Sequence, residues 1–180
     1  MGIMTSKAFI NILAVIDADY IVNHYEPNKN SKVDPQLIDN TSERLICAGS
    51  RGIISGQGTS DLSFKAVSGD FISFRGLSTS NNSDDAVIIY NIHREKGDLV
   101  FKNFVPDMTT VSQAVIPDPQ MPNGLPALYE PISFASFDSK IRKRGTESLS
   151  IQFGVYMLES NGQKQSLYGY YEWNTKITVD

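Results

Sequence analysis

The chain has 180 residues, of which 41% are hydrophobic and 20% are charged, and its formal net charge is −4. This length and composition exclude a disordered or fibrous chain and predict one domain with a sizeable core. The acidic balance gives no electrostatic reason to expect nucleic acid as a partner. The single cysteine, Cys47, excludes an internal disulfide bond and any metal site built from several cysteines.

The first apolar run, residues 8–16, is too short to span a bilayer and leads directly into Asp17 and Asp19. It also lacks the strongly basic start and the small-residue cleavage site of a secretory signal peptide. We therefore expect a buried strand here and no membrane insertion. A cytoplasmic protein is predicted, and release by a route that needs no signal peptide is left open.

Runs of β-branched and aromatic residues, separated by turn residues, are typical of strands and dominate the chain. Ser68-Gly69 predicts a hairpin between two such runs. Asn161-Gly162 predicts another with a type I′ turn, which needs positive φ at both central residues. The expected strands are residues 9–16, 45–48, 62–67, 71–74, 86–92, 99–104 and 132–137, with 149–158 and 166–173 as the arms of the last hairpin.

Only residues 34–44 suggest a helix, because Pro35 suits the first helical position. Residues 117–131 hold five of the eight prolines and predict a surface loop. Many short strands with turns between them predict a single all-β domain over residues 1–180, an antiparallel two-sheet β-sandwich, jelly-roll-like, with at most one short helix. Its expected core is Ile12, Ala14, Ile16, Leu62, Phe64, Ile88, Tyr90, Phe134, Phe153 and Val155.

Residues 55–62, with the sequence SGQGTSDL, form the most specific motif in the chain. The two glycines resemble the start of a phosphate loop, but Asp61 stands where a third glycine is required, and a strand pattern follows instead of a helix. We therefore expect a glycine-shaped turn into a strand. Gln57, Thr59 and Asp61 are a candidate ligand site, because the backbone can approach a ligand closely there. The alternative is that Thr59 and Asp61 only bond nearby amides.

Several stretches together resemble one family. They are the apolar strand that ends in Ile16-Asp17-Ala18-Asp19, residues 55–62, Gly69-Asp70, Arg75-Gly76 with Ser78, and residues 86–90. On these residues the chain resembles the PixA/AidA family of bacterial inclusion-body proteins over most of its length. The resemblance implies a small non-enzymatic protein, made abundantly at high cell density, that assembles into intracellular inclusions and is linked to host association. The chain departs from the family pattern at Trp173-Asn174-Thr175, where W-D-P is frequent.

Asp17 and Asp19 are two residues apart at the end of an apolar strand, a spacing that places both carboxylates on one face. Two like charges side by side need a cation or hydrogen-bond donors, which makes Ca²⁺ a candidate ligand. The oxygen-rich loop 81–85 would complete such a site. The predicted ligand-binding residues here are Asp17, Asp19, Tyr20, Asn81 and Asn82, and the predicted metal ligands are Asp17, Asp19, Asp84 and Asp85. The alternative is that these acids cap turns and accept bonds from backbone amides.

No catalytic motif is complete in the sequence. His24 and His93 are isolated, and neither H-E-x-x-H nor G-x-S-x-G occurs. The leading prediction is therefore a non-enzymatic, self-assembling protein that forms a dimer or a larger homo-oligomer. A Ca²⁺-dependent lectin that binds glycans is the first alternative. A glycan-acting hydrolase that uses paired carboxylates is the second.

Overall fold

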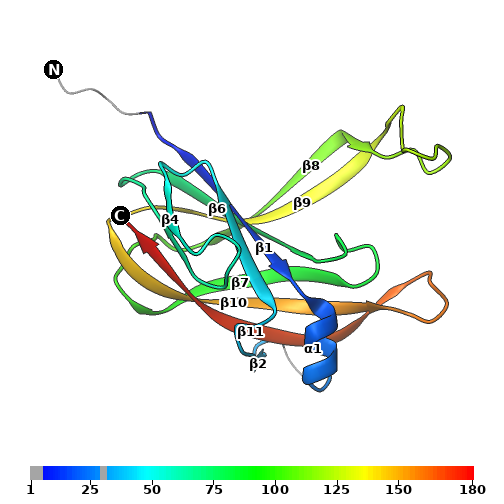
Figure 1. The fold of residues 1–180 in the computed structure, drawn as a ribbon, viewed down its shortest axis with the longest axis horizontal. Helices are drawn as coiled ribbons and strands as arrows, with labels where there is room; N and C mark the ends of the chain where they lie inside the picture. Colours follow the sequence, from blue (N-terminus) through cyan, green and yellow to red (C-terminus); the bar gives the residue numbers. More distant parts are fainter. Residues whose placement is uncertain (1–5, 29–31) are drawn as a thin grey trace.

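The computed structural model describes residues 6–28 and 32–180 and folds them into two packed β-sheets (Figure 1). The first sheet has the strand order β3-β1-β6-β9-β8, and the second has the order β4-β5-β11-β10-β7, with β2 paired to β11. The elements are β1 (Phe9–Ile16), α1 (Ala18–His24), β2 (Gln36–Leu37), β3 (Glu43–Ala48), β4 (Ile53–Ser55), β5 (Leu62–Phe64), β6 (Phe71–Ser78), β7 (Ala86–Gly97), β8 (Val105–Ile116), β9 (Leu128–Lys140), β10 (Gly145–Leu158) and β11 (Gln165–Val179). The predicted all-β sandwich with one short helix is confirmed. The domain predicted over residues 1–180 includes 1–5 and 29–31, which lie outside the described residues.

Both sheets are mixed, which differs from the antiparallel sandwich that the sequence predicted. β1 pairs in parallel with β6, and β11 pairs in parallel with β2 and with β5. Between β1 and β6 the chain visits the second sheet before it returns to the first. A parallel neighbour requires a crossover of this kind, and a pattern of strands and turns does not reveal it.

The helix lies at α1 and not at residues 34–44, where the sequence placed it. Asp17 follows β1 and caps the helix, since its side chain accepts a hydrogen bond from the Tyr20 backbone N–H at 3.0 Å. The segment after Pro35 forms β2 beside β11 instead, and the Ile38 N–H donates to the Glu172 carbonyl oxygen at 2.9 Å. Pairing with an existing sheet overrides the local preference for a helix start.

The hairpin around residues 160–163 is confirmed, because β10 and β11 are antiparallel neighbours along nearly their whole length. Its turn is not type I′, since Gly162 has a φ of 69° but Asn161 does not have a positive φ. The hairpin predicted at Ser68-Gly69 is wrong, because β5 and β6 belong to different sheets. The chain crosses from one sheet to the other at this turn, beside the buried side chain of Asp70.

Side chains from both sheets meet in one core, and seven of the ten predicted core residues are buried there. Ile88 is 52% exposed and Phe134 is 45% exposed, so these two predictions are wrong, and Tyr90 is only half-buried. A register shift between β7 and β10 inserts an extra residue into β7, which turns Val87, Ile89 and Ile92 inward. Phe134 is exposed because its part of β9 has left the body of the sandwich. The confirmed core residues are Ile12, Ala14, Ile16, Leu62, Phe64, Phe153 and Val155.

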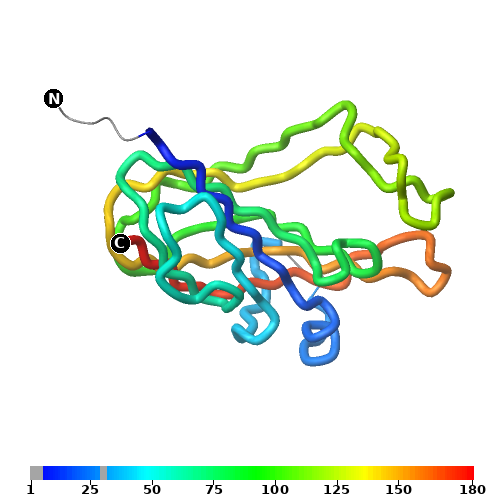
Figure 2. The backbone as a smooth tube through the Cα atoms, turned by 45° about the horizontal axis from the view of Figure 1, so that its top comes forward, coloured from blue at the N-terminus to red at the C-terminus, as the bar shows by residue number. Residues whose placement is uncertain are grey.

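β8 and β9 form a two-stranded ribbon that projects from the body (Figures 1 and 2). β9 pairs with the first half of β6 only, as far as Phe74↔Phe137, whereas β8 and β9 stay paired out to Ile116↔Leu128. We call residues 105–136 the ribbon and the rest of the sandwich the body. The sequence analysis assigned no strand at β8, whose many Thr, Ser and Gln residues mask the alternation of apolar side chains.

The strand predicted at residues 99–104 is also wrong. This segment forms only the single bridge Phe101↔Ile141. The backbone N–H groups of Val100 and Phe101 instead donate to the buried carboxylate of Glu147, at 2.6 and 3.0 Å. A side chain has taken the place of a strand partner, so the apolar run is buried without forming a ladder.

Candidate functional sites

The motif at residues 55–62 lies along β3, which is an edge strand of the first sheet. Gln57 acts as a substitute strand partner: its Oε1 accepts from the Cys47 N–H at 2.9 Å, and its Nε2 donates to the Cys47 carbonyl oxygen at 2.8 Å. The backbone of the loop continues this pairing, because the Leu45 N–H donates to the Thr59 carbonyl oxygen at 2.8 Å. The loop thus covers backbone groups that an edge strand would otherwise expose.

The other motif residues also have bonding roles within the chain. Gly56 has a φ of 82°, and a Cβ at this position would lie 2.2 Å from the Asp61 carbonyl oxygen, so only glycine fits. Thr59 Oγ1 lies 2.9 Å from the Gly56 carbonyl oxygen and 2.8 Å from that of Asp61. Asp61 Oδ1 accepts from the Lys176 N–H of β11 at 2.8 Å. The loop therefore links the two sheets, and a ligand role for Gln57, Thr59 and Asp61 stays a prediction.

The turn at Gly69-Asp70 holds an ion pair between the buried carboxylate of Asp70 and the partly exposed side chain of Arg51. The Asp70 carboxylate accepts from Arg51 Nε and Nη2, each at 2.8 Å, and from the backbone N–H groups of Ala8 and Val67, each at 3.0 Å. Hydrogen bonds from Arg51 hold the pKa of Asp70 well below its usual range. The sequence analysis did not single out Arg51, because the two partners are nineteen residues apart. This pair fixes the turn where the chain crosses between the sheets.

Gly76 allows the two sheets to approach each other. A Cβ on Gly76 would lie 2.6 Å from Cδ1 of Ile89 on β7. Ser78, at the end of the same strand, donates through Oγ to the Asp85 carbonyl oxygen at 2.5 Å. The residues that carry the family resemblance therefore shape the backbone of the sandwich.

The structure separates Asp17 from Asp19 and brings Asp19 to Asp85. Asp17 caps α1, whereas Asp19 lies in the first turn of the helix, so the assumption that both share one face of a strand is wrong. Burial raises the pKa of the Asp85 carboxyl group, and the negative charges of Asp19 and Asp84 raise it further. Two of the predicted metal ligands, Asp19 and Asp85, thus lie close together although they come from distant segments of the chain.

The loop 81–85 is bonded to its own neighbours. Asn82 Oδ1 accepts from the N–H groups of Ser78 and Val87, at 2.8 and 3.0 Å. Gln165 Nε2 donates to the carbonyl oxygens of Asn82 and Asp84, at 2.9 and 2.8 Å. In residues 6–28 and 32–180, no group of three or more His, Cys, Asp or Glu side chains has an arrangement that could hold a metal ion. The calcium site therefore stays a prediction, supported by the Asp19–Asp85 pair only.

Tyr20 and Tyr25 converge on Asp39 near α1. Their hydroxyl groups donate to Asp39 Oδ2 at 3.2 and 2.8 Å, and Tyr20 stacks on His24 with 4.0 Å between ring centroids. Hydrogen bonds from Thr41 and Tyr25 lower the pKa of Asp39 to about 2. Both tyrosines are thus held by hydrogen bonds within the chain, although they and Asp39 lie on the exposed side of the helix.

Glu43 is an acid inside the core, and its alternation with Leu45 and Cys47 is the only sequence feature that indicates its burial. The side chain is fully buried, and burial raises its pKa to about 7. Ser42 Oγ donates to Glu43 Oε1 at 2.5 Å, and Oε2 has no hydrogen-bond partner in the described part of the chain. No nucleophile or second catalytic group lies beside Glu43 in the described residues. We therefore interpret Glu43 as a group that makes the stability of the fold depend on pH.

The remaining reactive side chains have no catalytic partners within the described residues. Cys47 is buried, and burial raises the pKa of its thiol, which disfavours the nucleophilic thiolate. His24 Nδ1 lies 2.8 Å from the Tyr20 carbonyl oxygen, and His93 Nε2 lies 3.0 Å from Glu95 Oε1. Neither histidine lies beside Cys47, so these residues form no nucleophile–base pair.

The ribbon carries the largest set of exposed apolar side chains. Nine of the eighteen large hydrophobic residues that are exposed in the described residues lie in it, each between 40% and 66% exposed. Where it leaves the body, a groove of about 680 Å³ opens between Ile88 of β7 and Met108 and Phe134 of the ribbon. We call the nine residues the ribbon surface: Val105, Met108, Val111, Val115, Met121, Leu125, Leu128, Tyr129 and Phe134.

The structure thus defines a β-sandwich with an apolar, projecting ribbon and with no catalytic centre assembled among its described residues. The chain belongs to the PixA family of inclusion body proteins, whose profile matches residues 8–179. It is also similar to a solved structure, the inclusion body protein PixA from Burkholderia cenocepacia J2315, with 26% sequence identity, a TM-score of 0.76, and complete coverage of both chains. The search of curated proteins found no match. None of the described helical residues forms a helix long and apolar enough to cross a membrane.

Proposed function

We propose that this chain is a non-catalytic protein that assembles with copies of itself, and that the ribbon surface forms the contact. Family membership among inclusion body proteins supports dense self-association. The single observation that carries the proposal is the ribbon, because nine of its large apolar side chains are between 40% and 66% exposed.

The ribbon extends beyond the part of the sheet that packs on the body. A two-stranded hairpin is marginally stable in water unless it packs against something else. β8 and β9 nevertheless stay paired far beyond the last contact between β9 and β6. The ribbon contains no lysine or arginine, and its only charged residues are Asp107, Asp118 and Glu130. A second copy of the chain supplies a surface against which the ribbon packs.

The ribbon surface supplies part of the area that a stable dimer needs. If a fully exposed side chain of this size offers on the order of 170 Å², the nine residues of the ribbon surface present roughly 800 Å². A standard protein–protein interface buries about 800 Å² on each partner. Phe134 and Tyr129 are five residues apart on β9 and so lie on opposite faces of the ribbon. One face therefore offers about half of this area, and the contact also needs surface from the adjoining groove.

The edge of β8 favours contact through side chains over strand pairing. Pro106 and Asp107 stand at its start, and a bulge interrupts it between Val111 and Ala114. Proline, charge and bulges are features that block edge-to-edge pairing. We therefore propose a closed, two-fold dimer in which the two ribbon surfaces face each other.

Sedimentation velocity tests this proposal. The variant Val111→Lys with Tyr129→Lys places two charges on the ribbon surface, and the matched control Ile54→Lys with Leu37→Lys places them on apolar residues of similar exposure in β4 and β2. We expect wild type and control to sediment as dimers or larger species and the ribbon variant as a monomer. Monomers for all three proteins would refute self-assembly, and equal loss in both variants would refute the ribbon as its site.

The Ca²⁺-dependent lectin is retained as a second candidate because Asp19 and Asp85 lie together. Their charges would favour a cation, and the tyrosines around Asp39 lie on the same helix or directly after it. Association with a host through glycans would follow from this site and not from the ribbon. A glycan array run with Ca²⁺ and with a chelator tests it, and binding that ignores the chelator would refute the calcium requirement.

A further inference from the structure

Charged side chains gather by sign at the two ends of the sandwich. β7 follows Asp84 and Asp85 and carries Arg94 and Lys96 near its other end. β10 runs the opposite way, from the residue after Arg144 to the residue before Glu159. Because a strand rises about 3.3 Å per residue, these strands hold the two groups of charges roughly 30 Å apart. Figure 1 shows the turn between β9 and β10 on the left and the start of β7, near α1, toward the right.

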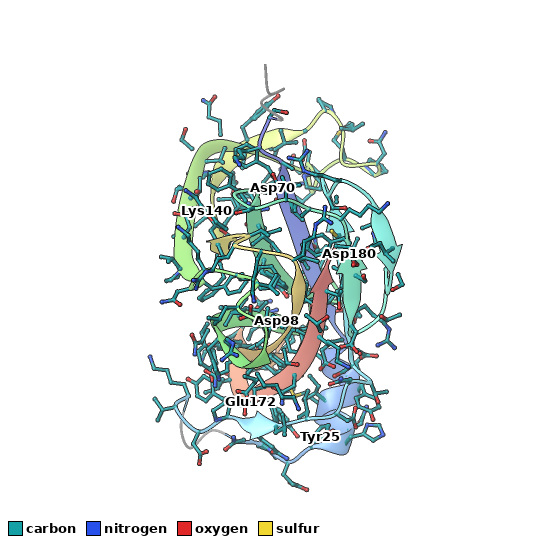
Figure 3. The ribbon with its side chains drawn as sticks, turned by 90° about the vertical axis from the view of Figure 1, so that its left-hand side faces the viewer. Tyr25, Asp70, Asp98, Lys140, Glu172 and Asp180 are labelled. Atoms are coloured by element: carbon teal, nitrogen blue, oxygen red, sulfur yellow. The ribbon has the colours of Figure 1, made fainter. Side chains whose placement is uncertain are left out.

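We call the charged residues of 94–102 and 140–147 the basic end; they are seven cations and three carboxylates, with a formal charge of +4 in a chain whose net charge is −4. Asp180 lies next to this group, because its neighbour Val179 pairs with Gly145. Lys143 pairs with Asp98 at 3.6 Å, but Lys102, Arg142 and Arg144 have no ion-pair partner among the described residues. Figure 3 looks onto this end, where Asp98 and Lys140 are labelled. Its charged residues are Arg94, Lys96, Lys102, Lys140, Arg142, Lys143 and Arg144, with Glu95, Asp98 and Glu147.

A pocket of about 150 Å³ concentrates this charge. Arg94, Lys102 and Arg142 line it, together with Glu147. The Glu147 carboxylate already has partners within the chain: it accepts from two backbone N–H groups and lies 3.9 Å from Arg94 Nε. Lys102 and Arg142 are therefore left without a counter-charge on the rim of a recess. Such a recess fits a carboxylate-bearing side chain from another molecule.

The acidic end supplies such side chains. It contains seven carboxylates, and only Glu159 has an ion-pair partner among the described residues, Lys164 at 3.4 Å. The group is continuous, since the Leu158 N–H donates to Asp85 Oδ1 at 3.4 Å and the Asp39 carboxylate accepts from two tyrosines that follow Asp19. The seven residues are Asp17, Asp19, Glu26, Asp39, Asp84, Asp85 and Glu159.

We propose that the basic end of one copy binds the acidic end of the next copy, in a head-to-tail contact distinct from the contact between ribbons. The Debye length is about 8 Å at physiological ionic strength, so the two ends of one molecule do not cancel each other's fields. Within an assembly, each end meets the opposite charge directly. This inference rests on the proposed self-assembly and adds its second contact.

Two contacts of different symmetry would explain how a small domain fills an inclusion. A two-fold contact between ribbons closes on itself and stops at a dimer. A head-to-tail contact joins unlike surfaces and continues without limit unless it closes into a ring. Together they connect dimers into an extended array.

A charge-swap experiment tests the inference. Lys102→Glu with Arg142→Glu reverses two charges at the pocket and lowers the formal charge of the basic end from +4 to 0. Asp19→Lys with Asp84→Lys reverses two charges at the acidic end. We expect species larger than the dimer to form about tenfold less readily for wild type when NaCl is raised from about 50 mM to about 300 mM. Each variant alone should lose them at low salt, and an equimolar mixture of the two variants should restore them. Thermal melting checks that both variants fold.

Arg142→Glu alone is compared with Arg75→Glu, which makes the same change on an exposed arginine of β6. Equal loss in both, assembly that ignores salt, or a mixture that restores nothing would overturn the head-to-tail contact. If one of these three results is obtained while dimers persist in every charge variant, only this inference fails and the ribbon contact stands. Monomers of the wild type at all concentrations and salts would refute both.

Discussion

The body and the ribbon use the same kinds of residue in opposite ways. Phe153 on β10 is fully buried between the sheets, whereas Phe134 on β9 is 45% exposed in the ribbon. The body is closed by its own side chains and by the loop 55–62 that covers the edge of β3. The ribbon has neither kind of cover. The body thus buries its apolar side chains within one chain, whereas the ribbon leaves them exposed, and the proposed contact with a second copy would cover them.

The largest expected effect contrasts these two phenylalanines. Phe153→Ala should destabilise the protein by about 3–5 kcal/mol, because it leaves a cavity in a closely packed core. Phe134→Ala should cost less than about 1 kcal/mol at concentrations where the protein is monomeric. Urea denaturation followed by fluorescence of the buried Trp173 measures both. Equal losses would mean that the ribbon is part of the folding core.

The second contrast concerns ion pairs in the body. Asp70→Asn should destabilise by about 2–4 kcal/mol, because Arg51 loses its charged partner and the buried cluster of hydrogen bonds is weakened. Asp98→Asn, the control, breaks an exposed pair with Lys143 and should have no measurable effect. Thermal melting of the two variants separates these outcomes, and a stable Asp70→Asn protein would contradict the structural role of the turn.

Glu43 makes the stability of the body depend on pH. Its pKa in the folded state is about 7, above the ordinary value of 4.5 for the unfolded chain. The folded state therefore binds the proton more tightly, and stability falls as pH rises from about 4.5 to 7, by an amount of about 2–3 kcal/mol. Glu43→Gln should remove this fall. Denaturation at pH 5 and pH 8 checks it, and parallel curves for wild type and variant would contradict the account.

The smallest expected effect is that of calcium. If Asp19 and Asp85 hold Ca²⁺ weakly, with a Kd of about 1 mM, then about 10 mM Ca²⁺ adds about 1.4 kcal/mol and raises Tm by about 4 °C. Asp19→Asn with Asp85→Asn should abolish the shift. Differential scanning fluorimetry with Ca²⁺ and with Mg²⁺ measures it. A wild type that gains nothing from Ca²⁺ would remove the metal site and leave these acids to the head-to-tail contact.

Local patterns predicted the parts of the fold that local physics determines. The first strand has the predicted bounds, and the turn at Asn161-Gly162 joins two strands as expected, because apolar alternation and a glycine turn act over a few residues. The parallel pairing of β1 with β6 could not be predicted, since it depends on a crossover through the second sheet. The start of α1 at Asp17 was missed because an acid after a strand suits a turn, a ligand or a helix cap equally.

The candidate sites also include features that local sequence predicts and features that depend on the whole fold. The sequence grouped Asp17 with Asp19 by spacing, but the change from strand to helix between them breaks that rule. The sequence suggested that loop 81–85 lies near Asp17 and Asp19. It could not show that Asp85 is the residue of this loop that interacts with Asp19. The ribbon surface could not be anticipated at all, because its apolar residues are typical of a core and only the departure of β9 from β6 exposes them.

Hydrogen exchange at two protein concentrations tests most directly whether the ribbon is completed by a second copy. Mass spectrometry compares peptides from residues 105–116 and 128–136 with peptides from β10 and β11. We predict that protection of the ribbon rises with concentration, whereas protection of the body stays constant. Ribbon amides that exchange equally fast at both concentrations, in a sample shown to contain dimers, would contradict the account.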